Sequence, residues 1–233
     1  MAQVINKFTG LRREGMVFLD ALSMQNDPIF FNANKDEYTK HIKQPLVELN
    51  SALEPCVKRI DMDLDTRAKR TICRIRKDAR YAKENPYRTN MWMSFKPADR
   101  SNTDYFTYFF YYDTTYYEIG IGFYGAHKAM MDEFRGRIDA NPRLFLKVVN
   151  SIDFDKYTLE GEDYKRPLKE FDFSSPIAEW YNKKGFYIYQ KKEIDETLFT
   201  DKLVDDVQQA FFDLVPIYDF VLGKEVRFER LTI

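Results

Sequence analysis

The chain has 233 residues, of which 44% are apolar, 31% are charged and 16% are aromatic, and its formal net charge is −1. The apolar fraction is enough for a sizeable core, and the near-neutral charge argues against indiscriminate binding to nucleic acid. No apolar run reaches the length of a membrane span. Charges scattered through the first twenty residues argue against a signal peptide. We therefore expect a cytoplasmic protein that does not enter a membrane.

Two cysteines and two histidines limit the metal and redox chemistry that the chain offers. Cys56 and Cys73 are too few for a disulfide framework, so we expect reduced thiols. His41 flanks an apolar helical stripe and His127 lies at a helix start, and both are interpreted as structural. No His/Cys spacing matches a zinc site. We expect neither a metal nor another cofactor.

Helical periodicity dominates the first 60 residues. One helix is expected over residues 12–23 and a longer one over 38–60, where apolar side chains recur at steps of three and four. Asn34 and Glu37 have the spacing of a capping box in front of the longer helix. Pro45 removes one backbone donor inside it, which predicts a kink.

An aromatic β-hairpin is expected over residues 105–124, where eleven of twenty side chains are aromatic and alternate along the chain. If Tyr112 stands opposite Tyr117, the apolar sets of both strands share one face, so a slip of one residue would be unfavourable. The same register places Phe109 beside Gly120. The predicted core-facing set is Phe106, Tyr108, Phe110, Ile119, Ile121 and Phe123.

Shorter strands and several helices surround this hairpin. Strands are expected at 71–76, 87–96, 186–190 and 226–231, and later helices over 126–139, 141–149, 175–185 and 200–223. No linker or repeat interrupts this order. The pattern predicts a single α+β domain over residues 1–233, with an antiparallel sheet and helices packed mainly on one face of it.

A concentrated basic segment lies between the helices expected in the first 60 residues and the aromatic hairpin. Residues 67–88 carry nine Lys or Arg and two acids, a local charge of +7, so the remaining residues sum to −8. We interpret the segment as a candidate anion site, because arginine can hold a carboxylate or phosphate at two points. If 71–76 is a strand, Arg74 and Arg76 project to one face. The candidate residues are Arg74, Arg76, Asp78, Arg80, Lys83 and Arg88.

The same segment resembles a family of bacterial and fungal proteins called domain of unknown function 2461. Its hallmark, Arg-Asp-x-Arg-Phe-Ser-Lys followed by Pro-Tyr-Lys, is matched by residues 77–83 and by Pro86-Tyr87-Arg88, with Lys77 for Arg and Ala82 for Ser. Flanking matches are Asn26 with Phe30-Phe31, Tyr38 with Pro45-Leu46, and Gly122-Phe-Tyr124 with Arg135. The resemblance implies the fold and a surface, which adds Tyr87, Tyr124 and Arg135 to the candidate ligand-binding residues. It implies no reaction.

Three functions remain open from the sequence. The first is a binding module for a small anionic ligand or an acidic partner. The second is an enzyme in which Asp78, Tyr81 or Tyr87 acts as acid or base and Arg80 stabilises negative charge. The third is a structural or interaction protein without a pocket. In a structural role, Asp78 and Arg80 form an ion pair that fixes a loop. On that interpretation the carboxylate is partly buried, and replacing Arg80 with Ala destabilises the fold markedly.

Nucleic acid is an unlikely partner on the same evidence. The aromatic side chains of the core-facing set are expected to be buried and so cannot stack on bases, and the motif of the common RNA-recognition sheet is absent. The rings left for an open face are Tyr105, Phe109, Tyr111 and Tyr124.

Overall fold

The alternating aromatic residues at the centre of the chain form two neighbouring strands of a sheet. The computed structural model describes residues 7–82, 84–101, 104–125, 128–171, 175–229 and 231. In it, β2 (Thr107–Tyr112) and β3 (Tyr116–Gly122) pair in antiparallel register, with Tyr112 opposite Tyr117 and Phe109 opposite Gly120. Both pairings confirm the sequence prediction. The register follows from the two-residue period of a strand, because only this pairing buries both apolar sets together.

The described residues form a five-stranded sheet in the order β1-β2-β3-β5-β4, and every neighbouring pair is antiparallel. The other strands are β1 (Met91–Phe95), β4 (Thr158–Glu160) and β5 (Tyr187–Glu193). Three residues are too few to show an alternating pattern, which is why the sequence did not predict β4. The predicted strand at 226–231 is wrong, because none of its described residues lies in a strand.

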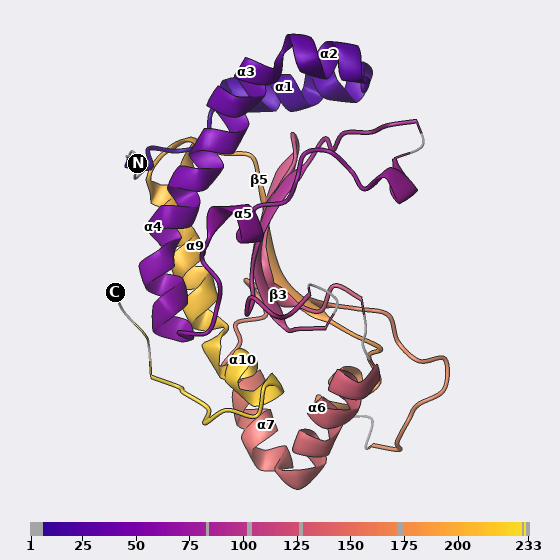
Figure 1. The fold of residues 1–233 in the computed structure, drawn as a ribbon. Helices are drawn as coiled ribbons and strands as arrows, with labels where there is room; N and C mark the ends of the chain where they lie inside the picture. The colour runs from indigo at the N-terminus through magenta and orange to yellow at the C-terminus, as the bar shows by residue number, and fades with distance from the viewer. Residues whose placement is uncertain are drawn as a thin grey trace.

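Helices lie before, between and after the strands of the sheet along the chain (Figure 1). Before it lie α1 (Arg13–Met24), α2 (Pro28–Ala33), α3 (Lys35–Tyr38), the π-helix η1 (Thr39–Lys43), α4 (Gln44–Ile60), α5 (Ala68–Thr71) and the short 3₁₀ helix η2 (Ala79–Tyr81). After β3 lie α6 (Lys128–Ala140), α7 (Pro142–Val149), α8 (Ile177–Tyr181), the 3₁₀ helix η3 (Glu196–Phe199), α9 (Lys202–Asp213) and α10 (Val215–Val221).

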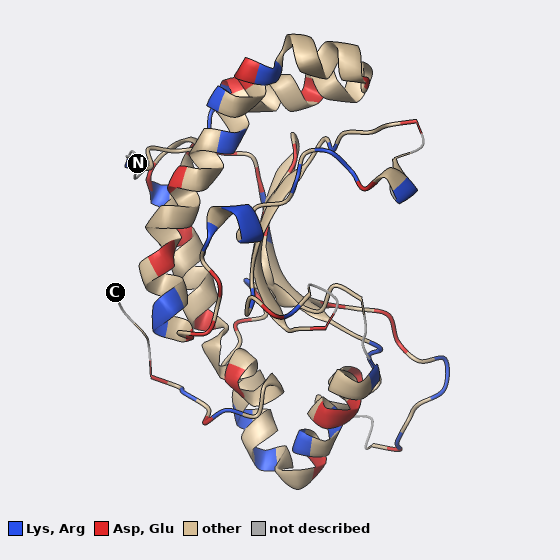
Figure 2. Cartoon of the chain, in the orientation of Figure 1, with Lys and Arg blue, Asp and Glu red and all other residues tan. Residues whose placement is uncertain are grey.

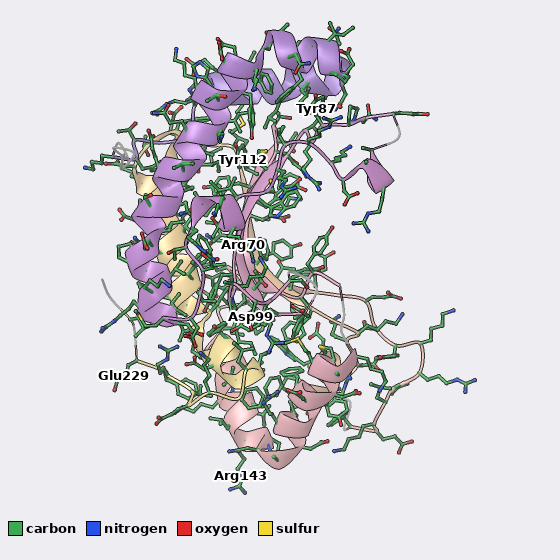
Figure 3. The ribbon with its side chains drawn as sticks, viewed as in Figure 1. Arg70, Tyr87, Asp99, Tyr112, Arg143 and Glu229 are labelled. Atoms are coloured by element: carbon green, nitrogen blue, oxygen red, sulfur yellow. The ribbon has the colours of Figure 1, made fainter. Side chains whose placement is uncertain are left out.

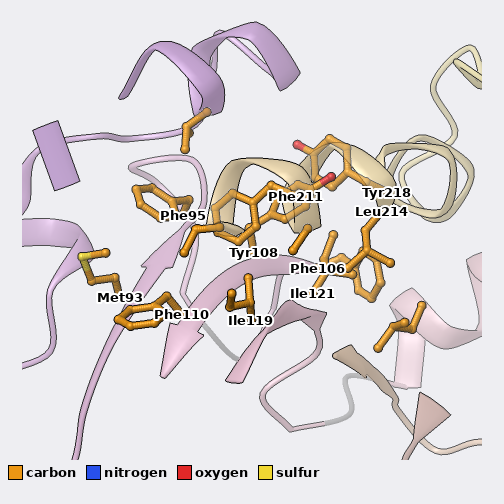
Figure 4. Packing of buried hydrophobic residues seen from close by; sticks show 14 of the residues in the cluster. Met93, Phe95, Phe106, Tyr108, Phe110, Ile119, Ile121, Phe211, Leu214 and Tyr218 are labelled. Atoms are coloured by element: carbon orange, nitrogen blue, oxygen red, sulfur yellow. The ribbon is translucent and has the colours of Figure 1, made fainter. Parts of the chain in front are cut away.

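The main core lies between one face of the sheet and the helices α4 and α9, which run side by side in Figure 1. The predicted core-facing side chains of β2 and β3 are all buried, and so are Met91, Met93 and Phe95 of β1. Figure 4 shows several of these side chains packed beneath Phe211 of α9. Phe95 and Tyr108 each contact the Phe211 ring, at centroid distances of 5.8 and 4.8 Å. The arrangement is the predicted α+β fold.

Helix termini differ from the sequence predictions at three places. The Asn34 side chain makes no capping hydrogen bond, so the predicted capping box is wrong. Instead, Asp27 caps α2 by accepting from the backbone N–H groups of residues 29 and 30. The chain from α3 to α4 stays helical, and the wider π-helical turn η1 immediately precedes Pro45. Near the C-terminus, the predicted single helix is two helices, because α9 ends at Asp213 and Pro216 occupies the first turn of α10.

The opposite face of the sheet carries aromatic side chains that are only partly buried. They are Trp92, Phe109, Tyr111, Tyr116, Tyr187 and Tyr189. The β-ladder places Trp92 directly opposite Tyr111, and Ser94 opposite Phe109. Of the rings predicted for an open face, Phe109 and Tyr111 lie here, whereas Tyr105 is buried at 9% exposure.

Candidate functional site

The basic segment forms a short antiparallel extension beside the edge strand β1. After α5 the chain runs extended, and Cys73 N–H donates to the Trp92 carbonyl at 3.0 Å. Two further backbone bonds, Arg88 N–H to Ile75 O and Lys77 N–H to Pro86 O, are each 2.8 Å long. The chain therefore leaves the sheet at residue 77 and returns at 86, which makes residues 77–86 a projecting loop (Figure 1).

Charged and apolar side chains alternate along this extended segment. Ile75 is 7% exposed, whereas its neighbours Arg74 and Arg76 are both exposed. Successive side chains of an extended chain point to opposite sides, so the two guanidinium groups leave the chain in the same direction. Figure 2 shows basic residues on α5 and along the chain that follows it, at this edge of the sheet.

A pocket of about 450 Å³ lies beside this segment. Its lining includes five cationic side chains and one carboxylate, for a local charge of +4 at neutral pH. We call it the basic pocket, and its lining residues are Arg70, Thr71, Ile72, Cys73, Arg74, Arg76, Lys77, Asp78, Arg88, Trp92 and Ser94. The structure thus brings together Arg74, Arg76, Asp78 and Arg88 of the predicted site.

Asp78 is already neutralised by Arg80. Its carboxylate accepts from Arg80 Nε at 3.0 Å and from Nη2 at 2.7 Å, and it also accepts from the Arg80 backbone N–H at 3.0 Å. The Arg80 side-chain hydrogen bonds are the main reason that the pKa of Asp78 lies below its ordinary value. The two side chains are 46% and 77% exposed. The expectation of a partly buried carboxylate is therefore wrong, and the pair lies at the surface.

Asp65 makes the same arrangement with Arg67 at the start of the basic segment. Arg67 donates from Nε at 2.9 Å, from Nη2 at 2.6 Å and from its backbone N–H at 3.0 Å. Arg70 Nε lies 3.8 Å from the same carboxylate, and the Arg70 guanidinium also donates to the Ala98 carbonyl. Figure 3 labels Arg70 beside the sheet. Arg70 therefore already has a counter-charge and a hydrogen-bond acceptor within the fold, although it lines the pocket.

Four of the five cations that line the basic pocket have no carboxylate partner among the described residues. Arg74, Arg76, Lys77 and Arg88 form no ion pair there. Arg88 lies over the ring of Trp92, with its guanidinium carbon 4.4 Å from the ring centroid. A cation over an aromatic face is attracted by the ring but keeps its full charge. The basic pocket therefore holds an excess of positive charge that the described part of the fold does not balance.

Tyr87 fixes the projecting loop to the N-terminal helices. Its ring is 4% exposed and stacks on Phe31 with centroids 4.2 Å apart. The Asn26 side chain bonds both backbone groups of Tyr87, accepting from its N–H at 2.8 Å and donating to its carbonyl at 3.1 Å. Three residues singled out by the family resemblance thus meet here. Their contacts anchor the return of the loop, so Tyr87 is a structural residue in this arrangement.

The remaining predicted site residues do not line the basic pocket. Arg135 on α6 is 5% exposed, and it donates to the carbonyls of Tyr181 and Lys183 at 2.8 and 2.6 Å and to Asp132 at 3.0 Å. Tyr124 is 68% exposed just after β3. Figure 1 places α6 at the other end of the sheet from the projecting loop. The predicted residues Lys83 and His127, and the side chain of Tyr81, lie outside what the structure describes.

Sequence reasoning did not select Trp92, Ser94 or Arg70 for the site. The signal was nevertheless present for two of them, because predicting Met91, Met93 and Phe95 on the core face implies that Trp92 and Ser94 point the other way. Only the pairing of residues 72 and 73 with β1, continued by the pairing of residues 75–77 with 86–88, brings that face next to the arginines.

Within the described ranges, no group of three or more His, Cys, Asp or Glu side chains is arranged to hold a metal ion. A search for membrane spans among the same residues finds no helix long and apolar enough to cross a bilayer. Residues 14–220 match the model of a family described as conserved hypothetical protein (DUF2461). No curated protein matches the sequence.

Proposed function

The chain belongs to the DUF2461 family, whose description assigns no activity, and we propose from its basic pocket that it binds a small organic anion bearing phosphate or carboxylate groups. The observation that carries the proposal is the unbalanced charge. Arg74, Arg76 and Lys77 face one pocket and pair with no described carboxylate. Like charges held together raise the energy of the empty site, and a bound anion would lower it.

The size and chemistry of the pocket support a small ligand over an acidic protein surface. Its volume of about 450 Å³ lies within the range of roughly 300–1,000 Å³ typical of small-molecule sites. Two adjacent guanidinium groups suit phosphate or carboxylate because each can donate two parallel hydrogen bonds.

The enzymatic alternative has less support in the same geometry. Asp78 is the one carboxylate among the described residues that line the pocket, and its pKa is lowered chiefly by the hydrogen bonds from Arg80. A carboxylate with a lowered pKa is a weak base at neutral pH. Tyr87 is stacked beneath Phe31, away from the pocket lining. Binding without a reaction is the simpler proposal.

Thermal unfolding in the presence of candidate anions tests the proposal. Inorganic phosphate, pyrophosphate, citrate and adenosine monophosphate form a suitable panel, at salt concentrations of about 0.05 and 0.15 M because exposed charges are screened. A ligand at about 100 times its Kd adds about 2.7 kcal/mol to the unfolding free energy. For a domain of this size that corresponds to a rise in Tm of about 5–10 °C.

Matched arginine variants assign the effect to the pocket. The double variant Arg74→Gln/Arg76→Gln should lose the ligand-induced rise in Tm. Arg143→Gln removes an exposed charge on α7, far from the pocket (Figure 3), and should keep the rise. If no anion of the panel raises the Tm, or if the double variant responds as fully as the native protein, the proposal is wrong.

A further inference from the structure

The walls of the basic pocket differ in character. The cations Arg74, Arg76 and Lys77 come from the extended segment that leaves the sheet. Arg70 and Arg88 also line the pocket, and apart from Asp78 the remaining lining residues are uncharged. We call them the uncharged wall, and they are Thr71, Ile72, Cys73, Trp92 and Ser94. A ligand that fills the pocket therefore meets both positive charge and an apolar or weakly polar surface.

The pocket volume exceeds what a bare inorganic anion needs. At about 30 Å³ per water molecule, a volume of about 450 Å³ has room for about fifteen water-sized groups. Orthophosphate has five heavy atoms and would fill about a third of this volume. The uncharged wall is left for the rest of a larger molecule.

Trp92 gives the uncharged wall an aromatic surface. Its ring is partly exposed and lies on the open face of the sheet. The β-ladder continues this surface through Tyr111, opposite Trp92, and through Phe109, opposite Ser94. Tyr111 in turn stacks on Tyr116, with centroids 5.7 Å apart. Planar rings stack on such side chains whatever their substituents, because the interaction needs only a π-face.

We infer that the ligand carries a planar ring that lies against Trp92 while its phosphate or carboxylate groups are held by Arg74 and Arg76. This inference rests on the proposed function and adds the class of ligand: an anion with an aromatic or heteroaromatic ring. Arg88 also lines the pocket, and its guanidinium lies over the Trp92 ring, so the ligand's ring would pack against Trp92 beside this cation. A nucleotide and a simple aromatic acid share this chemistry.

Pairs of anions that differ only by a ring test the inference. We would measure the affinity of phenyl phosphate against propyl phosphate, of phthalate against succinate, and of adenosine monophosphate against ribose 5-phosphate. Stacking on one aromatic side chain predicts that the ring-bearing member binds about tenfold more tightly. A preference for adenosine monophosphate over phenyl phosphate would identify a nucleotide as the source of the ring, and the reverse would identify a smaller aromatic acid.

Trp92 also provides the readout. The chain has two tryptophans, and Trp180 is 1% exposed in the core, so a ring bound in the pocket should change the fluorescence of Trp92. Trp92→Leu should abolish both the signal and the tenfold preference, so that the ring-bearing and the ring-free member of each pair bind the variant equally well. Trp92→Phe retains a ring and should keep most of the preference, which guards against a folding defect in the leucine variant.

The outcomes separate this inference from the function on which it rests. If ring-bearing and ring-free anions bind the native protein equally well, or if Trp92→Leu keeps the preference, the inference is wrong and anion binding stands. If no member of any pair binds, the proposed function fails, and the inference fails with it.

Discussion

Replacing Asp65 with Asn probes how the fold tolerates the concentration of positive charge around the basic pocket. The Asp65 side chain is 8% exposed and accepts two side-chain hydrogen bonds from Arg67, with Arg70 at 3.8 Å. Asparagine keeps the shape and one acceptor oxygen, but it removes the negative charge. Two arginines next to the pocket then lose their counter-charge, so we expect the unfolding free energy to fall.

The pKa of Asp65 sets the magnitude of this effect. Hydrogen bonds from Arg67, with the charges of Arg67 and Arg70, lower the pKa from 3.8 to about 2, although burial acts in the opposite direction. At about 1.36 kcal/mol per pKa unit, the upper limit is about 2.4 kcal/mol at neutral pH. The Arg67 side chain is 60% exposed, and water weakens such a pair. We therefore expect a loss of about 1–2 kcal/mol.

The pH dependence distinguishes this electrostatic loss from a packing defect. A carboxylate whose pKa is lowered in the folded state stabilises fully above its unfolded pKa, near 3.9, and loses that effect as the pH falls towards 2. The difference between native and variant protein should thus be constant from pH 7 to 5 and fall to about half near pH 3.

Urea unfolding of both proteins at pH 7, 5 and 3 measures this difference. Asp99→Asn is the matched control, because Asp99 is exposed and forms no ion pair among the described residues (Figure 3). Equal stability of Asp65→Asn and the native protein at pH 7 would refute the reasoning. So would a loss of stability that is the same at pH 3 as at pH 7.

Three further predictions follow from individual contacts. Arg80→Ala should change the urea midpoint little, because its ion pair is exposed; a large drop would mean that the loop depends on it. Gly120→Ala should lower the unfolding free energy by about 1–3 kcal/mol, since a Cβ there would lie 2.2 Å from Ile188 O. Gly136→Ala on α6, with nothing within 4 Å, is its control and should not destabilise. Burial of the Cys73 thiol raises its pKa to about 11. Cys73 should therefore react slowly with iodoacetamide at pH 8 until urea unfolds the protein. If Cys73 reacts as fast in the native protein as in urea, this reasoning is wrong.

The sheet was the most predictable part of the fold because its sequence pattern allows one register. In β2 and β3, moving one strand by a single residue would take Ile119 and Ile121 off the core face and put Gly120 in their place. The helix ends were less predictable, because capping depends on a single side chain. Asp27 and Asn34 both have the right chemistry, and the sequence does not show that the chain remains helical past Asn34.

The position of the site was predictable from charge, but its shape was not. Nine cations among residues 67–88 indicate where an anion could bind. The uncharged wall requires Trp92, which is brought there by backbone pairing between Cys73 and β1. That pairing consists of isolated bridges, so it leaves no regular alternation in the sequence.

A local rule nevertheless explains which arginines of the segment are neutralised. Arg67 and Arg80 each follow an aspartate by two residues, and in both cases the carboxylate binds the arginine's backbone N–H and its guanidinium. The Asp-x-Arg spacing thus supplies a counter-charge from the same turn of chain. Arg74 and Arg76 are preceded at that position by Ile72 and by Arg74 itself, so neither has a local counter-charge. Arg74 and Arg76 are therefore left without a carboxylate partner among the described residues, and a ligand is the counter-charge that we propose for them.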